Sequence, residues 1–220
     1  MPAWTSERTS EMGFSLSTRQ RSAAIWALYA FGLLPGLWTF YLGVTAQLGA
    51  DPVRTFEHSL GLWALRFICL TLVVTPVRDL FKINLLPYRR ALGLLAFWYV
   101  LAHFTVYLTL DRGLIFSSIL GDMTKRPYII IGMACLIMLI PLAITSNRWS
   151  IRRLGTRWAK LHKLIYPIAA GAALHYALSL KSVTLEPATY IGIVIVLLAY
   201  RLFRTKIVEW RRARRMAVAH

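Results

Sequence analysis

The sequence predicts an all-α integral membrane protein folded as a bundle of six transmembrane helices. Two observations lead to this prediction. The 220-residue chain is 57% hydrophobic and has a mean hydropathy of +0.55. Uncharged or nearly uncharged segments also recur along it, several of them reaching the roughly 20 residues that a helix needs to cross a bilayer. We therefore take lipid, and not water, as the solvent around most of the chain.

Six segments qualify as spans, and short polar connectors containing Gly, Pro, Asp and Asn separate them. The first is longer than the apolar region of a secretory signal, about 7–15 residues, so we expect it to be retained. None of the connectors is long enough to fold as a domain, so we expect a tail at 1–21, one helical domain at 22–203 and a basic tail at 204–220. The predicted spans are residues 22–45, 59–77, 91–110, 127–146, 164–180 and 187–203.

The formal net charge of +17 is explained by membrane topology. Of the 26 Lys and Arg residues, 20 fall in the two tails, the connectors on their side and the second half of the last span, and five fall in the opposite connectors. This asymmetry predicts a multi-pass protein with both termini in the cytoplasm, and anionic lipid head groups as partners of the basic residues. A basic patch without a recognition module gives no support to nucleic-acid binding.

Two histidines are predicted to share one depth in the bilayer. His103 lies about thirteen residues after the cytoplasmic Arg90, and His175 lies about thirteen residues after the entrance to the fifth span, so each is roughly 20 Å deep at 1.5 Å per residue. Histidines on different helices at one level can supply the two axial nitrogens of an iron porphyrin. Hydrogen bonding between helices is the alternative use of such residues.

His162 is a weaker candidate, because it lies at the interface between Lys160 and Lys163. Thirteen residues turn an ideal helix so that His162 and His175 face directions about 140° apart. A kink at Pro167 is one way to redirect them. Arg89, fourteen residues before His103, cannot be the second ligand because a guanidinium stays protonated.

Two further polar residues need an explanation. Arg66 lies inside the second span, where a charge is costly without an anionic partner, and a haem propionate would suit its guanidinium. Snorkelling or a backbone carbonyl is the alternative. His58, at the outer edge of the same span, fits ordinary interfacial packing, with a quinone, a propionate or a partner surface as other possible contacts.

Several kinds of site are absent from the sequence. Cys69 and Cys135 each lie within an apolar span, as small buried hydrophobic residues do. No C-x-x-C-H motif for covalent haem is present, and no G-x-G-x-x-G or P-loop motif for a nucleotide. We therefore expect electrons to come from a quinol in the membrane or from a separate cytosolic flavoprotein.

Nearly the whole chain, from about residue 25 to 203, resembles the MsrQ (YedZ) family, which is related to ferric reductase-like transmembrane domains. The resemblance is carried by stretches such as "LGADPVRTFEHSLGLWALRFICLTLVVTPVRDL", "RRALGLLAFWYVLAHFTVYL" and "LGTRWAKLHKLIYPIAAGAALHY". It implies a six-helix fold of ferric reductase-like type in the bacterial inner membrane. It also implies that His103, His162 and His175 are the haem histidines.

The same resemblance implies a function. Such a subunit binds b-type haem, takes electrons from the quinone pool and passes them to MsrP, a periplasmic molybdopterin subunit that reduces methionine sulfoxide in oxidised proteins. Its role is electron transfer, and the substrate chemistry belongs to the partner. The resemblance leaves open whether one or two haems bind, and whether FMN binds. The wider oxidase family has a fourth histidine where Arg89 stands.

Two other functions compete with this one. The first is a stand-alone transmembrane metalloreductase or oxidase-type haem protein fed by a separate cytosolic flavin reductase. The second is a transporter whose histidines relay protons, which is disfavoured because the spans contain no acidic residue. These alternatives differ in haem content and in the partner that each would require.

Overall fold

The computed structural model describes residues 17–180 and 184–218 of the chain, and within these ranges it contains helices and no strand. The long helices are α1 (Thr18–Val44), α2 (Pro52–Phe81), α3 (Arg89–Val106), α5 (Pro127–Ile144), α8 (Ile165–Ser179) and α9 (Leu185–Val218). Each covers most of one predicted span. The prediction of an all-α fold is thereby confirmed, while residues 1–16 of the predicted N-terminal tail lie outside the described ranges.

Four helical segments are long and apolar enough to cross a membrane by themselves: α1, α2, the segment from Leu86 to Asp111, and α5. Helix α8 is shorter, at 15 residues, and α9 continues to Val218 through the position where the last span was expected to end. The number of six spans therefore stays a prediction.

Short elements join the long helices. They are two 3-10 turns (Leu86–Tyr88 and His162–Leu164), a π-helical turn (Tyr107–Asp111), α4 (Phe116–Lys125), α6 (Arg148–Leu154) and α7 (Thr156–Leu161). Local sequence explains several of the helix ends. Ser17 and Gln20 form a capping box at the start of α1, Asp51 caps α2 just before Pro52, and Asn147 caps α6.

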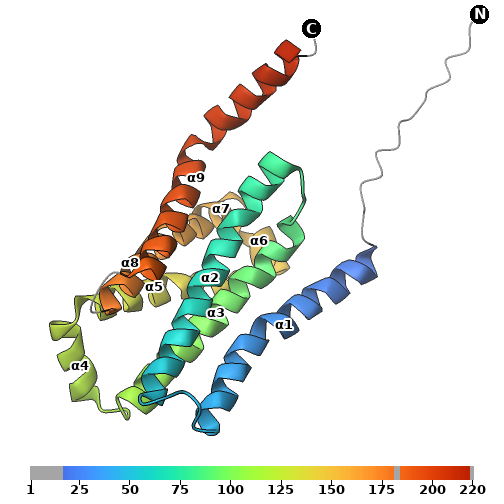
Figure 1. Ribbon diagram of the computed structural model, residues 1–220. Coiled ribbons are helices and arrows are strands. Elements are labelled where there is room, and N and C mark those ends of the chain that lie inside the picture. Colours follow the sequence, from blue (N-terminus) through green and yellow to red (C-terminus); the bar gives the residue numbers. More distant parts are fainter. Residues whose placement is uncertain (1–16, 181–183, 219–220) are drawn as a thin grey trace, which may run out of the picture.

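The core lies between α2, α3, α5 and α8. Figure 1 shows α2 and α3 side by side in the middle of the bundle, α1 at one edge, and α9 at the other edge, running past the ends of its neighbours. Leu72, Leu95 and Ile168 are almost completely buried there. Gly171 lets α8 approach α5 closely, since a Cβ added to it would lie 2.6 Å from Cys135 Sγ. Close packing of small residues is the usual means of association between helices in lipid.

Helix α1 is attached to the bundle through Tyr99 of α3. The Tyr99 hydroxyl accepts a hydrogen bond from the Gly36 amide at 2.9 Å and donates one to the Gly32 carbonyl at 2.8 Å. These two backbone groups would otherwise bond to each other within the helix, next to Pro35, which has no amide donor. The tyrosine therefore inserts into the backbone ladder of α1.

We predict that Tyr99→Phe lowers the free energy of unfolding by about 1 kcal/mol, because the hydroxyl that joins α3 to two backbone groups of α1 is lost. Thermal unfolding of the detergent-purified protein measures this effect. Tyr41→Phe is the matched control, since Tyr41 lies on α1 with 52% of its surface exposed. Equal stability of the two variants would show that the bridge contributes nothing.

Candidate metal centre

His103 of α3 and His175 of α8 lie opposite each other inside the bundle. Their ring centroids are 6.2 Å apart and their planes are nearly perpendicular, at 89°. The prediction that these two histidines occupy one level of the bundle agrees with this geometry. The segment between them in sequence is long, so the pair is a product of the tertiary fold.

Each histidine is anchored through its Nδ1 atom to the main chain of a neighbouring helix. His103 Nδ1 lies 2.8 Å from the Glu57 carbonyl oxygen on α2, and His175 Nδ1 lies 2.7 Å from the Tyr128 carbonyl oxygen on α5. A carbonyl can only accept a hydrogen bond, so Nδ1 carries the proton in both rings. Each Nε2 therefore keeps a free lone pair, which is the arrangement typical of metal-binding histidines.

A glycine lies against each ring, in the same register on both sides. A Cβ added to Gly61 would lie 3.1 Å from His103 Nδ1, and one added to Gly132 would lie 2.8 Å from His175 Nδ1. Gly61 follows Glu57 by four residues, and Gly132 follows Tyr128 by four. One helical turn thus provides both the carbonyl that binds the ring and the gap that admits it.

The spacing of the pair fits one metal ion between the two rings. Metal–imidazole bonds of about 2 Å on each side, together with the distance from each ring centre to its own nitrogen, account for nearly all of the 6.2 Å separation. Among the described residues, no group of three or more His, Cys, Asp or Glu side chains could hold a metal ion. Two imidazoles on opposite sides of one metal ion are a ligand set that suits the iron of a haem.

The pair lines a cavity of about 680 Å³, within the range of roughly 300–1,000 Å³ found for small-molecule and cofactor sites. Its deeper wall is apolar and its open end is polar, which suits a flat apolar group carrying charges on one edge. The apolar wall includes Leu65, Ile68, Val100, Ile129 and Leu136, and the polar end includes Asp51, Arg54, Glu57, Asp111, Arg112 and Arg126.

The polar end of the cavity carries arginines that the protein only partly neutralises. Asp122 is buried, accepts a hydrogen bond from Tyr107 and pairs closely with Arg112. Arg126 is 3.7 Å from the same carboxylate and about half exposed. Arg54 makes no salt bridge with any described residue. Two guanidinium groups are therefore available at the open end to an anionic ligand.

His162 has a different environment. Its Nε2 lies 3.0 Å from Thr145 Oγ1, and that hydroxyl already donates to the Pro141 carbonyl at 2.6 Å, so His162 Nε2 is the donor between them. Its ring stacks on Trp158, with centroids 3.9 Å apart. Burial and the nearby Arg89 lower the pKa of His162, which keeps the ring neutral. His162 does not line the cavity of the other two histidines.

The guanidinium of Arg66 has its hydrogen-bonding and ion-pair partners within the protein. Its Nε donates to the Tyr190 hydroxyl at 2.8 Å, and its guanidinium lies over the Trp63 ring and 3.9 Å from Glu186. The anionic partner expected for it is therefore Glu186, and Arg66 is not among the cavity residues. His58 does line the cavity and packs against Tyr176, with centroids 5.4 Å apart.

Comparison with known proteins gives consistent results. Residues 60–173 match the model of the ferric reductase like transmembrane component. A protein of Agrobacterium fabrum, named protein-methionine-sulfoxide reductase heme-binding subunit MsrQ, is 64% identical over 91% of this chain and 94% of its own length. Proteins of the same name from Brucella ovis and Brucella canis are 61% identical over 82% of each chain. No solved structure matches the chain.

The chain belongs to the MsrQ family. The resemblance predicted from sequence is thereby confirmed, as is a membrane fold of ferric reductase-like type. In this MsrQ-family chain the matched segment contains His103, Gly61, Tyr128 and Gly132, begins three residues after Glu57 and ends two residues before His175.

The residues that hold the two histidine rings were not predicted from the sequence. Glu57 and Tyr128 act through backbone carbonyls, and since every residue has a carbonyl, the order of side-chain types cannot reveal this role. The glycines were visible as Gly61 and Gly132, but only the fold shows that they face the two rings. The cavity arginines were counted as connector charge and were not assigned to the site.

We predict that Gly132→Ala and Gly61→Ala weaken metal or haem binding by about 10–100-fold, the range seen when groups that orient a ligating histidine are altered. Gly132→Ala should have the larger effect, because its added methyl would lie 2.8 Å from the His175 ring. The bound fraction is measured optically during titration of the purified apoprotein.

Gly93→Ala is the matched control, since Gly93 also lies on α3 and an added Cβ would meet nothing within 4 Å. If Gly132→Ala and Gly93→Ala bind equally well, the close approach of Gly132 to the His175 ring has no role in positioning it.

Proposed function

We propose that this chain is the haem-binding membrane subunit of a methionine sulfoxide reductase system and carries electrons to a periplasmic catalytic partner. The main support is the His103–His175 pair, because the two rings lie 6.2 Å apart and the two Nδ1 anchors leave each Nε2 unprotonated as a neutral ligand. Relatives 64% and 61% identical carry the name of that system, which supports the same partnership here.

The residues of the cavity fit haem b. His103 and His175 would hold the iron from its two sides, and Gly61 and Gly132 would keep the two rings in position. Arg54 and Arg126 would bind the two propionates at the open end, since a guanidinium pairs well with a carboxylate. This assignment replaces the one first considered for Arg66. When bound, haem supplies one-electron transfer between ferric and ferrous iron.

Saturation of the iron by two imidazoles favours electron transfer over oxygen chemistry. If His103 and His175 both held the iron, the haem would supply electron transfer and would not bind oxygen or a substrate directly. The chain would act as a conductor, and the bond-breaking step would occur on the partner, a molybdopterin subunit of the MsrP type. This distinguishes the proposal from a self-sufficient oxidase.

We place the open end of the cavity at the periplasmic face of the bacterial inner membrane, with both termini in the cytoplasm. The support is the excess of Lys and Arg in the tails and in the connectors on their side. In this orientation the residues at the open end, including Asp51, Arg54 and Asp111, would lie next to the docking surface of the partner. Electrons would then leave the chain by a short path.

The proposed electron source is the quinone pool, with a cytosolic flavin reductase, or FMN bound to the chain, as the other source suggested by the sequence. A quinol gives up two electrons and two protons. Reduction of a sulfoxide to a thioether and water consumes two of each, so one quinol balances one methionine sulfoxide. The membrane location of the chain supports a donor that is itself dissolved in the bilayer.

The test is haem content and electron delivery in purified protein. We expect the parent to contain b-type haem by the pyridine haemochrome assay, and to pass electrons from a reduced quinol analogue to added MsrP in the presence of methionine sulfoxide. His103→Ala and His175→Ala should each lose the haem of this pair. His162→Ala should keep it, because His162 bonds to Thr145 and lies outside the cavity.

Folding of each variant is checked by gel filtration, with His58→Ala as a control histidine from the same cavity. Absence of b-type haem from the parent would refute the proposal. Retention of all haem in both His103→Ala and His175→Ala would refute the assignment of the ligands.

A further inference from the structure

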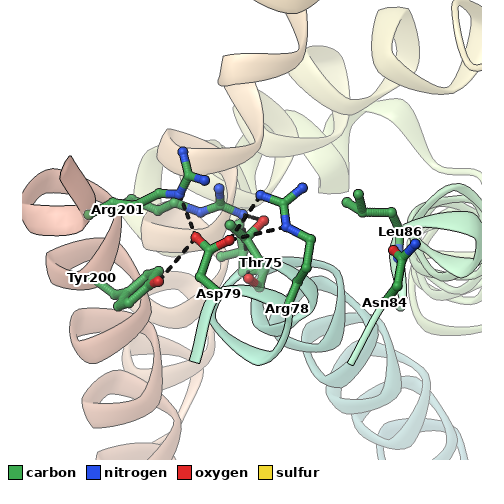
Figure 2. A network of polar contacts seen from close by, with 9 residues as sticks. Thr75, Arg78, Asp79, Asn84, Leu86, Tyr200 and Arg201 are labelled. Carbon is green, nitrogen blue, oxygen red and sulfur yellow. Dashed lines mark hydrogen bonds and ion pairs between the residues drawn. The ribbon is translucent and has the colours of Figure 1, made fainter. Parts of the chain in front are cut away.

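A second group of charged residues lies at the end of the bundle opposite to the open end of the cavity, where α2, α3 and α9 meet. Four arginines gather there: Arg78, Arg89, Arg201 and Arg204. Figure 2 shows Asp79 at the centre of this group, with Arg78 and Tyr200 directed toward it. We call these four arginines together with Asp79 the arginine cluster.

Both carboxylate oxygens of Asp79 accept hydrogen bonds within the cluster. One of its oxygens accepts from Arg78 at 3.0 Å, and the other accepts from Arg204 Nε at 2.6 Å and from the Tyr200 hydroxyl at 3.2 Å. Its side chain is only 9% exposed. Two of the four arginines, Arg78 and Arg204, thereby share the single carboxylate that the described part of the chain brings to them.

Arg201 is held by neutral groups alone. Its Nη2 donates to Thr75 Oγ1 at 2.6 Å and lies 3.5 Å from the Leu72 carbonyl, and its guanidinium lies over the Tyr166 ring at 5.8 Å. Its Nε is buried and has no hydrogen-bond partner in the described structure. A half-buried guanidinium held in this way retains its full charge and an unused donor, which is unfavourable without an anion.

Arg89 is the second uncompensated cation. It is partly buried, and the described residues give its guanidinium no hydrogen bond or salt bridge. Arg89 and Arg204 repel the charge of Arg201 more strongly than Asp79 attracts it. The bundle thus holds two neighbouring guanidinium groups, on α3 and α9, whose charges no residue of the described chain neutralises.

We propose that Arg89 and Arg201 form a binding site for the phosphate of an anionic phospholipid. A guanidinium matches a phosphate in charge and in geometry, and basic pockets between helix ends are typical sites for anionic head groups. The site lies where α2 ends and α3 begins, next to the exposed apolar residues Phe81 and Ile83, which can contact acyl chains. Bound lipid would tie α3 to α9 at this end of the bundle.

The experiment compares haem-loaded protein in nanodiscs of phosphatidylcholine alone with nanodiscs that also contain phosphatidylglycerol. We expect the parent to unfold at a higher temperature with phosphatidylglycerol and to retain one such lipid in native mass spectrometry. Arg89→Gln should lower the affinity for phosphatidylglycerol by about tenfold, the effect of losing one charge-assisted hydrogen bond. Arg201→Gln should do the same.

Arg201→Gln also removes the bond to Thr75, so its stability is expected to fall in both kinds of nanodisc. The decisive quantity is therefore the difference in unfolding temperature between the two lipids, which a purely structural defect would leave unchanged. Arg157→Gln is the control, because Arg157 is an exposed arginine of α7, in a connector predicted to lie on the same side of the membrane as the arginine cluster.

Two results would overturn the proposal. One is a lipid-dependent difference that Arg89→Gln leaves at the parental value, or that Arg157→Gln reduces equally, since charge would then act without a defined site. The other is stabilisation by inorganic phosphate in phosphatidylcholine nanodiscs equal to that by phosphatidylglycerol, since the site would then take soluble phosphate in place of lipid.

Discussion

The structure depends on two hydrogen bonds that fix histidine rings to main-chain carbonyls. In lipid no water is present to satisfy a polar side chain, so each imidazole must find a partner within the protein. His103 bonds to α2 and His175 bonds to α5. Helices α2 and α3 pack extensively against each other, as do α5 and α8. Each helix pair is therefore one half of the proposed metal centre, and docking of the halves sets the distance between the two rings.

Small residues make this arrangement possible. A side chain at Gly61 or Gly132 would occupy the space of a histidine ring, and a larger residue at Gly171 would push α8 away from α5. Tyr99 performs a related task for α1, because its hydroxyl replaces a backbone bond next to Pro35. The polar groups within the bundle thus serve mainly to hold helices at fixed separations, and the apolar residues fill the space between them.

The sequence predicted the helices well because the uncharged runs that mark a span also end where the charged connectors begin. Helix α8 agrees with the predicted span to within one residue at each end. The common depth of His103 and His175 followed from the rise of a helix alone. The backbone anchors and the arginine contacts could not be predicted, because they depend on which faces of separate helices meet. Arg66 illustrates this, since its partner Glu186 precedes the last predicted span and is 120 positions away.

The most direct test of the account is the electron paramagnetic resonance spectrum of the oxidised haem-loaded protein. Two neutral imidazoles with planes at 89° should give the strongly anisotropic low-spin ferric signal that perpendicular axial ligands produce. A high-spin signal would mean that one histidine does not bind the iron. A rhombic low-spin signal of the kind given by parallel imidazole planes would mean that the carbonyl anchors do not fix the rings as the structure has them.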